Sequence, residues 1–215
     1  MAKSVNGREI QLEPNSRPFL AKRLIADGFD TVLLFGLFML LTAWIMTTPF
    51  AGTYTAHYER FRAIEAETSA QYNNDAAGIS EALSGNEEYR SERFAAALHS
   101  YILKAVCCLA AELVLFLAIP LLRKDRATVG KILTGVMPFH LRRQARAEWY
   151  QILYRFLFIF IIDSLVLYLF TGIWTFILVP VIRLSEMLLN RNNRTVCDGV
   201  TGIMIIEKLS YNGIN

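Results

Sequence analysis

Four apolar stretches of this chain have the length of membrane-crossing helices. A crossing helix needs roughly 20 residues, because each residue of a helix rises about 1.5 Å. Charged residues make up only 19% of the chain, against about a quarter in a soluble domain. The sequence therefore predicts an all-α membrane protein, a bundle of about four transmembrane helices. The predicted spans cover about 24–46, 101–122, 152–170 and 173–189.

The fourth of these stretches is the weakest, because charged residues and a proline interrupt it. Pro180, Arg183 and Glu186 all fall within residues 173–189. A proline inside a helix removes a hydrogen bond and bends the axis. This stretch is therefore either a kinked span or a helix that leaves the membrane half-way.

A long polar insertion separates the first two spans. Residues 50–99 contain eight acidic and four basic residues. Apolar residues at helical spacing predict a surface helix over 56–71, and a second short helix passes through Ile79 and Leu83. The insertion interrupts a membrane domain of residues 21–210, which follows a polar tail of residues 1–20.

The basic residues predict the orientation of the bundle. Seven basic residues lie in the connection 123–150, whereas the basic residues of 50–99 are diluted over a longer stretch. Positively charged loops stay on the cytoplasmic side of a membrane. We therefore expect both termini to be cytoplasmic and the acidic insertion to be extracytoplasmic.

Three charged motifs lie at or near the cytoplasmic ends of the predicted helices. Arg23, Asp27 and Asp30 share one helical face, because steps of three, four and seven residues return to the same side. Facing lipid costs a charge several kcal/mol, so this stripe should point into the bundle. The other two motifs are Thr128-Val129-Gly130-Lys131, with Gly135 after it, and Arg194-Thr195-Val196-Cys197-Asp198, with Gly202 after it.

These motifs, in this order around the spans, resemble the RDD family of bacterial membrane proteins. That family has an arginine, an alanine three residues on and an aspartate four further, which Arg23, Ala26 and Asp30 match. Its Thr-x-Gly-Lys segment and the arginine heading the next helix are matched in turn by Thr128, Gly130, Lys131 and Arg155.

The last family motif is matched less completely. It is typically His-Asp followed by Gly-Thr. Asp198 and Gly202 fit this pattern, whereas Cys197 replaces the histidine and Ile203 replaces the threonine. Any mechanism that uses that histidine is in doubt here.

The resemblance implies a multi-pass protein of the bacterial cytoplasmic (inner) membrane, and a transporter that exchanges Na⁺ or another alkali cation for protons. Buried carboxylates can bind a cation and a proton in turn. Four spans are few for a monomeric carrier, so we expect a homo-oligomer in the lipid bilayer. The ion- or proton-handling candidates are Arg23, Asp30, Glu112, Asp163 and Asp198.

A non-transporting membrane module is the alternative, either a scaffold or an assembly factor that binds partners through the acidic 50–99 insertion. In that case the buried ion pairs only fix which helices meet. An enzyme is not expected, since no nucleophile and base are paired. The sequence also predicts no cofactor, no metal site and no nucleic-acid partner, because the net charge is only +3 and the three cysteines lack a zinc spacing. We find no internal repeat.

Overall fold

The computed structural model describes residues 3–5, 8–10, 17–73, 75–140, 145–190 and 194–207. Half of the predicted tail 1–20, and Arg142 and Arg143 of the basic connection, lie outside the described residues. The chain forms two compact units. Unit 1 combines Met1–Phe38 with Cys108–Asn215, and unit 2 is Met39–Cys107. A short antiparallel pair, β1 (Lys3–Val5) with β2 (Arg8–Ile10), precedes the first helix.

Three helical runs are long and apolar enough to cross a membrane, so the chain is an all-α membrane protein in this region. The first lies within α1 (Arg17–Met46), which contains the predicted span 24–46. The predicted third and fourth spans fall within a single run. The three runs are Phe19–Met46, Glu87–Leu122 and Trp149–Leu189.

The second run begins earlier than the sequence predicts. It comprises α4 (Glu87–Glu112), a π-helical segment η2 (Leu113–Ala118) and α5 (Ile119–Leu122). The predicted span 101–122 lies within this longer helical run, whose first residues, 87–100, are rich in Glu, Arg and Ala. These residues favour helix without being apolar.

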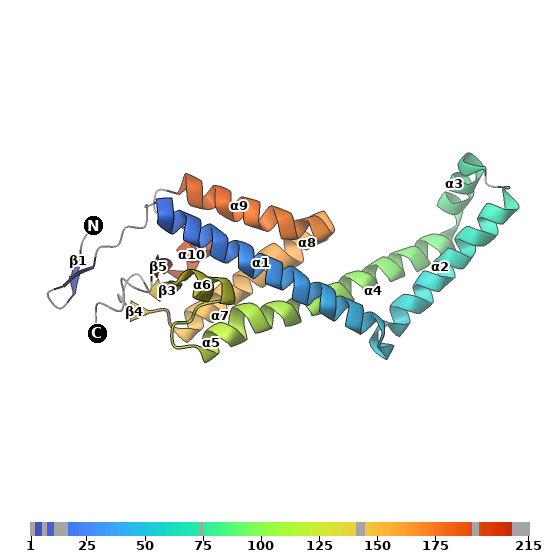
Figure 1. The fold of residues 1–215 in the computed structure, drawn as a ribbon. Helices are drawn as coiled ribbons and strands as arrows, with labels where there is room; N and C mark the ends of the chain where they lie inside the picture. Colours follow the sequence, from blue (N-terminus) through green and yellow to red (C-terminus); the bar gives the residue numbers. More distant parts are fainter. Residues whose placement is uncertain are drawn as a thin grey trace. The chain divides into compact units, whose positions relative to one another are not determined.

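The third run is 41 residues long, about twice what one crossing requires. Gly172 interrupts it with φ of 57° and ψ of −134°, a conformation that essentially only glycine adopts. Figure 1 shows α9 folding back from this point beside α1. Pro180 lies inside α9 without ending it. The elements of the run are α7 (Trp149–Phe158), π-helical η3 (Ile159–Leu167), α8 (Tyr168–Thr171), 3₁₀-helical η4 (Gly172–Trp174) and α9 (Thr175–Leu189).

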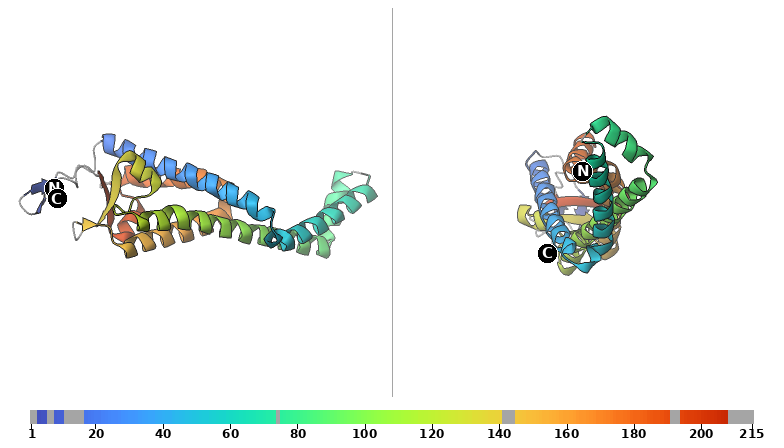
Figure 2. Two further views of the ribbon diagram at one scale, coloured as in Figure 1. Left: turned by 60° about the horizontal axis from the view of Figure 1, so that its bottom comes forward. Right: turned by 90° about the vertical axis from the view of Figure 1, so that its right-hand side faces the viewer.

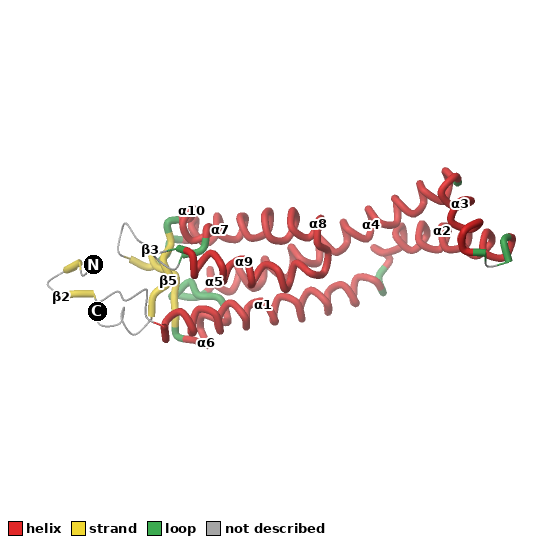
Figure 3. Tube along the Cα trace, turned by 90° about the horizontal axis from the view of Figure 1, so that it is seen from above, coloured by secondary structure: helices red, strands yellow, loops and turns green. Residues whose placement is uncertain are grey.

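A small antiparallel sheet, which the sequence analysis did not predict, lies in unit 1. Its strand order is β4–β3–β5. Figure 3 shows β3 and β5 at the end of the unit where α1 and α7 begin. The strands and the short helices before them are α6 (Val129–Thr134), β3 (Val136–His140), β4 (Ala145–Arg146), α10 (Val196–Thr201) and β5 (Ile203–Glu207).

The second and third charged motifs of the sequence form a repeat, which corrects the expectation that none exists. In each copy a threonine occupies the N-terminal cap position of a six-residue helix, a glycine of positive φ ends the helix, and a strand follows. Residues 128–137 read TVGKILTGVM and residues 195–204 read TVCDGVTGIM. The strands pair so that Pro138 lies opposite Ile205, its own counterpart in the other copy. The pairing therefore relates the two copies by an approximate two-fold axis, and we call each copy the helix–strand motif.

The core of unit 1 forms where this sheet meets the helices. Successive residues of a strand point to opposite faces. Ile203 and Ile205 accordingly join Phe19 and Ala26 of α1 and Ile152 of α7 in one cluster. The opposite face buries Met137, Phe139, Met204 and Ile206. In the left view of Figure 2, α1 and α7 extend away from the end of the unit where this sheet lies.

Unit 2 contains the polar insertion. Its helices include η1 (Pro49–Ala51), α2 (Gly52–Gln71), α3 (Ala76–Gly85) and the first part of α4. The surface helix predicted over 56–71 lies within α2, and the second predicted helix is α3. Asp75 caps α3 by accepting hydrogen bonds from the backbone of Ala77 and Gly78. Side-chain pairs such as His57–Glu92, at 2.6 Å, join α2 to α4.

Candidate functional site

The charged stripe of α1 is buried. The exposed fractions of Arg23 and Asp30 are 3% and 5%, and Ala26 between them is fully covered. The stripe therefore points into unit 1, as the cost of exposing charge to lipid requires. Arg23 and Asp30 each contact a different helix–strand motif.

Asp198 lies between two arginines from different helices. One carboxylate oxygen accepts a hydrogen bond from Arg23 Nη2 at 2.7 Å, and the other accepts one from Arg155 Nη1 at 2.6 Å. Asp198 is fully buried, and its backbone N–H donates to the hydroxyl of Thr195, which caps α10. Arg23 and Asp198 are 175 residues apart in sequence, so this ion-pair triad ties α1, α7 and α10 together.

The electrostatic surroundings of Asp198 keep it ionised. Burial raises the pKa of this carboxyl. The charges of Arg155 and Arg23 lower the pKa by more than burial raises it, so the resulting pKa is about 2. Asp198 is therefore a permanent anion at neutral pH. Because its two arginines belong to α1 and α7, Asp198 links α10 to both of these helices.

Asp30 is bound in a different way, mainly by the other helix–strand motif. The Thr128 hydroxyl donates to one carboxylate oxygen at 2.5 Å, and the Gly130 N–H donates to the other at 2.7 Å. Thr128 makes no capping bond to α6 itself. The Thr128 hydroxyl instead donates to Asp30 of α1, whereas the Thr195 hydroxyl caps its own helix, α10.

Lys131 completes this second cluster. Its ammonium nitrogen lies 3.3 Å from Asp27 and 3.5 Å from Asp30, and its side chain is 7% exposed. Asp27, the acid that the family pattern does not contain, therefore shares the lysine with Asp30. Two carboxylates beside one ammonium leave one negative charge that other basic side chains must balance.

Gly130 permits the close contact between α6 and α1. A Cβ atom at this position would lie 2.0 Å from the carbonyl oxygen of Ala26. A side chain there would push α6 away and break the hydrogen bond to Asp30. The glycine and the alanine of the two motifs are thus required together.

A model of the RDD family matches residues 17–202, which is most of the chain. The chain belongs to the RDD family. No curated protein and no solved structure matches it.

The family positions of this RDD protein lie mainly at the two clusters. Arg155 and Asp198 belong to the first, and Asp30, Thr128, Gly130 and Lys131 to the second. Gly202 ends α10 with φ of 67°, as Gly135 ends α6. Cys197, which replaces the typical histidine, is buried with its sulfur 3.9 Å from the backbone oxygen of Arg155.

Glu112 forms a third polar site, apart from the helix–strand motifs. It is fully buried at the end of α4, and its Oε1 accepts a hydrogen bond from the Ser164 hydroxyl of η3. The Cys108 sulfur lies 4.0 Å from the same oxygen. A cavity adjoins these groups, lined by several hydroxyls, including those of Thr31, Tyr168 and Thr175.

Several residues of these sites were not singled out for them in the sequence. Ser164 and the other hydroxyl residues near Glu112 belong to no sequence motif. Asp27 was noted only as an acid that the family pattern does not contain. Asp163, a predicted candidate, falls within η3, but its side chain lies outside the described part of the structure. Among the described residues, no group of three or more His, Cys, Asp and Glu could hold a metal ion.

Proposed function

We propose that this RDD protein exchanges an alkali cation such as Na⁺ for protons across the membrane, and that Glu112 carries the exchanged ion. The observation that carries the proposal is the complete burial of Glu112 in an apolar membrane helix, beside a cavity lined by hydroxyls. A carboxylate at such a depth is costly and marks functional sites in membrane proteins.

The other buried acids are less suited to exchange. Asp198 is held by two arginines, and Asp30 by Thr128, Gly130 and Lys131. A carrier carboxylate must alternate between a proton and a cation, whereas the two arginines keep Asp198 ionised and hydrogen bonds already occupy both oxygens of Asp30. The proposal therefore assigns Asp30 and Asp198 to the framework and Glu112 to the ion.

The cavity next to Glu112 has the chemistry that an alkali cation requires. Hard cations bind oxygen ligands, and the carboxylate with the hydroxyls of Thr31, Ser164 and Thr175 supplies several. Arg183 lines the same cavity, and its charge weakens cation binding. Weak binding suits a carrier, because the ion must leave as well as enter.

The backbone around Glu112 supports a functional role. The π-helical segment η2 begins at the next residue, and Ser164 lies within the π-helical segment η3. π-Helical turns are rare and occur frequently at functional sites. Two such segments therefore meet where Glu112 and Ser164 form their hydrogen bond.

The proposed topology has four crossings. The break at Gly172 divides the 41-residue run into Trp149–Thr171, which has the length of one crossing, and the shorter piece Gly172–Leu189, which is at the lower end of the crossing range. Both termini would then be cytoplasmic, with the helix–strand motifs on that face of the inner membrane and residues 50–99 outside. Cysteines at Ile173 and at Asn190, tested with an impermeant maleimide, should label from opposite sides of the membrane. Labelling from one side would leave only three crossings.

The experiment that tests exchange uses everted vesicles with an imposed pH gradient and a fluorescent pH probe. Addition of Na⁺, K⁺ or Li⁺ should dissipate the gradient in vesicles with wild-type protein. Glu112→Gln should abolish the response, and Ser164→Ala should raise the half-maximal cation concentration about tenfold, the effect of one hydrogen bond to a charged group. Asp30→Asn and Asp163→Asn test the other acids, and Glu81→Gln, an exposed acid of α3, is the matched control.

The outcomes separate the function from its site. If wild-type vesicles that contain the protein respond to none of the three cations, the exchange function is wrong. If Glu112→Gln responds as wild type does and Asp163→Asn does not, exchange stands and the site moves to Asp163.

A non-transporting scaffold is the second candidate function, and one observation favours it. The ion-pair triad at Asp198 joins three helices without any of its groups facing the cavity beside Glu112. Such a triad fixes helix arrangement. A wild-type protein that is folded and moves no protons would favour this reading.

A further inference from the structure

The cavity beside Glu112 is closed on one side by α9. Thr175, Phe176, Val179 and Arg183 line it, and they share one face of this helix because of their helical spacing. The cavity measures about 30 Å³, which is room for about two waters. Because Glu112 is fully buried, an ion bound to it can leave only when a wall of the cavity moves.

The helix α9 is packed less deeply than the elements on the other sides of the cavity. Only Thr175 and Met187 of its 15 residues are buried. The ion-pair triad links α1, α7 and α10, and Lys131 with its two acids links α6 to α1. These buried ion pairs fix the framework against which α9 lies.

Two contacts near the start of α9 hold it in place. The ring centroid of Phe176 lies 5.2 Å from that of Phe35 and 5.1 Å from that of Phe38, both on α1. The hydroxyl oxygens of Thr171 and Thr175 lie 2.7 Å apart across the break before α9. Aromatic pairs and hydrogen bonds of this kind are weak enough to break and form again during a transport cycle.

The chain enters α9 through Gly172, which has the properties of a hinge. Its φ of 57° and ψ of −134° are open to glycine, and no atom lies within 4 Å of the place where a Cβ would be. Hinges are a few residues at the ends of elements that absorb the change in φ and ψ. Arg183 follows 11 residues later, about 16 Å along the helix, so a rotation of about 10° moves it by about 3 Å.

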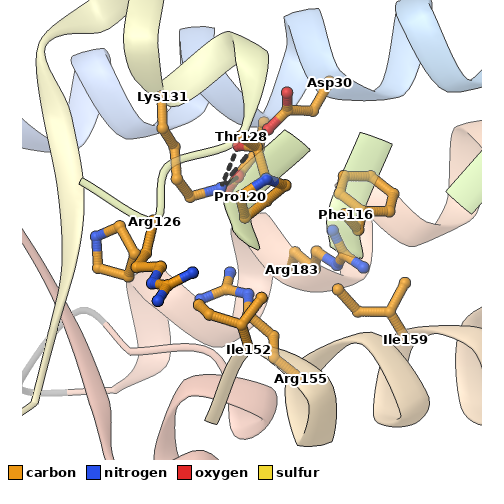
Figure 4. Close-up of a pocket in the computed structure, with 12 residues that line it drawn as sticks. Asp30, Phe116, Pro120, Arg126, Thr128, Lys131, Ile152, Arg155, Ile159 and Arg183 are labelled. Atoms are coloured by element: carbon orange, nitrogen blue, oxygen red, sulfur yellow. Dashed lines mark hydrogen bonds and ion pairs between the residues drawn. The ribbon is translucent and has the colours of Figure 1, made fainter. Parts of the chain in front are cut away.

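A second cavity begins where the first one ends. Phe116, Ile159 and Arg183 line both cavities. Figure 4 shows Phe116 and Ile159 on the side of the second cavity opposite Arg126. This cavity measures about 20 Å³, which is room for about one water, and the proposed topology places the α6 residues that line it toward the cytoplasm. Movement of α9 at Arg183 therefore joins the two cavities.

We propose that α9 is a gate, which turns about Gly172 and opens the Glu112 cavity toward the cytoplasmic end of the bundle. The gate rests on the proposed function, because it gives the exchanged ion its route to Glu112. The structure shows the closed state. When α9 turns, Arg183 moves with it, so the charge that weakens cation binding leaves the cavity as the cavity opens.

A native thiol reports the opening, because Cys108 lines the Glu112 cavity. The test uses the full chain in detergent and chloride-free buffer, with Cys107→Ala and Cys197→Ala. It measures the rate at which Ag⁺, a monovalent cation that binds thiolates, protects Cys108 from a maleimide added after unfolding. The control protein retains Cys107 alone. Cys107 is as deeply buried as Cys108, at 3% against 5% exposed, and is not among the residues that line the cavity.

Two variants weaken the contacts that hold α9 without changing the lining of the cavity. Phe35→Ala removes a ring that packs on Phe176, and Thr171→Val removes a hydroxyl. Each should raise the rate at Cys108 roughly three- to tenfold. Phe29→Ala is the matched control, because Phe29 is exposed on the same helix and no ring contact is described for it, so its rate should equal that of wild type. Size-exclusion profiles and thermal melting establish that each variant is folded.

The gate is overturned if both folded variants react at the wild-type rate. It is also overturned if Phe29→Ala, or the Cys107 control thiol in the Phe35→Ala protein, reacts faster to the same degree, because general loosening would then explain the change. The labelling is measured without transport. A gate that opens as expected in a protein without cation exchange would contradict the proposed function alone, whereas exchange with unresponsive labelling would contradict the gate alone.

Discussion

Lys131 and Asp198 occupy the same position in the two copies of the helix–strand motif, and they carry opposite charges. Each is the third residue after the threonine that precedes its helix. Lys131 lies near Asp30, and Asp198 binds Arg23. Arg23 and Asp30 are seven residues apart on one face of α1, so this helix presents opposite charges to the two motifs. Exchanging the motifs would bring like charges together, and the pairing therefore defines which motif binds where.

Removing Asp198 should destabilise the protein more than removing one of its arginines. Asp198→Asn leaves Arg23 and Arg155 facing each other without their anion, and loss of one partner of a buried pair costs about 3–5 kcal/mol. Arg23→Gln leaves Asp198 with Arg155 and should cost less. Unfolding in mixed micelles of increasing sodium dodecyl sulfate content measures both.

The double variant Arg23→Gln with Asp198→Asn checks this interpretation. Because both changes affect one triad, its loss of stability should be clearly smaller than the sum of the two single losses. Additive losses would mean that the two residues act separately.

The stability of the protein should fall in acid because of Asp198. Its pKa is lowered from 3.8 to about 2 in the folded protein. The resulting stabilisation, about 2 kcal/mol, is therefore complete above pH 4–5 and is lost as the pH falls through 2. Melting temperatures of wild type between pH 6 and 2.5 should decline more steeply than those of Asp198→Asn. Parallel curves would show that Asp198 does not contribute.

A methyl group at position 130 should separate α6 from α1. Gly130→Ala places a Cβ 2.0 Å from the Ala26 oxygen, and overpacking of this kind costs about 1–3 kcal/mol. Gly199→Ala is the matched control in α10, because no atom lies within 4 Å of its added Cβ. The control should be neutral or slightly stabilising in thermal melts, since alanine favours helix. Equal melting temperatures for the two variants would contradict the close contact.

The break between α8 and α9 should depend on glycine. At φ of 57° and ψ of −134° a side chain is strained, so Gly172→Ala should cost about 1–3 kcal/mol even though no atom crowds the site. Gly36→Ala, in the middle of α1 with open space around it, should not destabilise. Thermal melting of the two variants in the same detergent compares them directly, and a neutral Gly172→Ala would argue against this conformation.

The sequence predicted the apolar helices well, because length and hydropathy alone determine them. It also predicted that Arg23 and Asp30 turn inward, since lipid excludes charge. These predictions needed only the position of a charge within an apolar run.

Sequence reasoning did not find the small sheet or the partners of the charges. The strands at Val136–His140 and Ile203–Glu207 are short and buried on both faces, so they lack the alternation that identifies a strand. The pairing of Arg23 with Asp198 spans 175 residues and depends on where α10 packs. The repeat was missed because each copy has only ten residues and only half of the positions are identical.

The three residues of the triad are synthesised at different times. Arg155 leaves the ribosome 43 residues before Asp198, and Arg23 precedes it by 175. At about 5–20 residues per second, Arg23 waits on the order of 10–35 s for its anion. Until then neither arginine has this counter-charge, so both must stay near water or headgroups while the later helices insert. The triad therefore forms only after α10 has been synthesised, which follows the synthesis of the membrane-crossing segments.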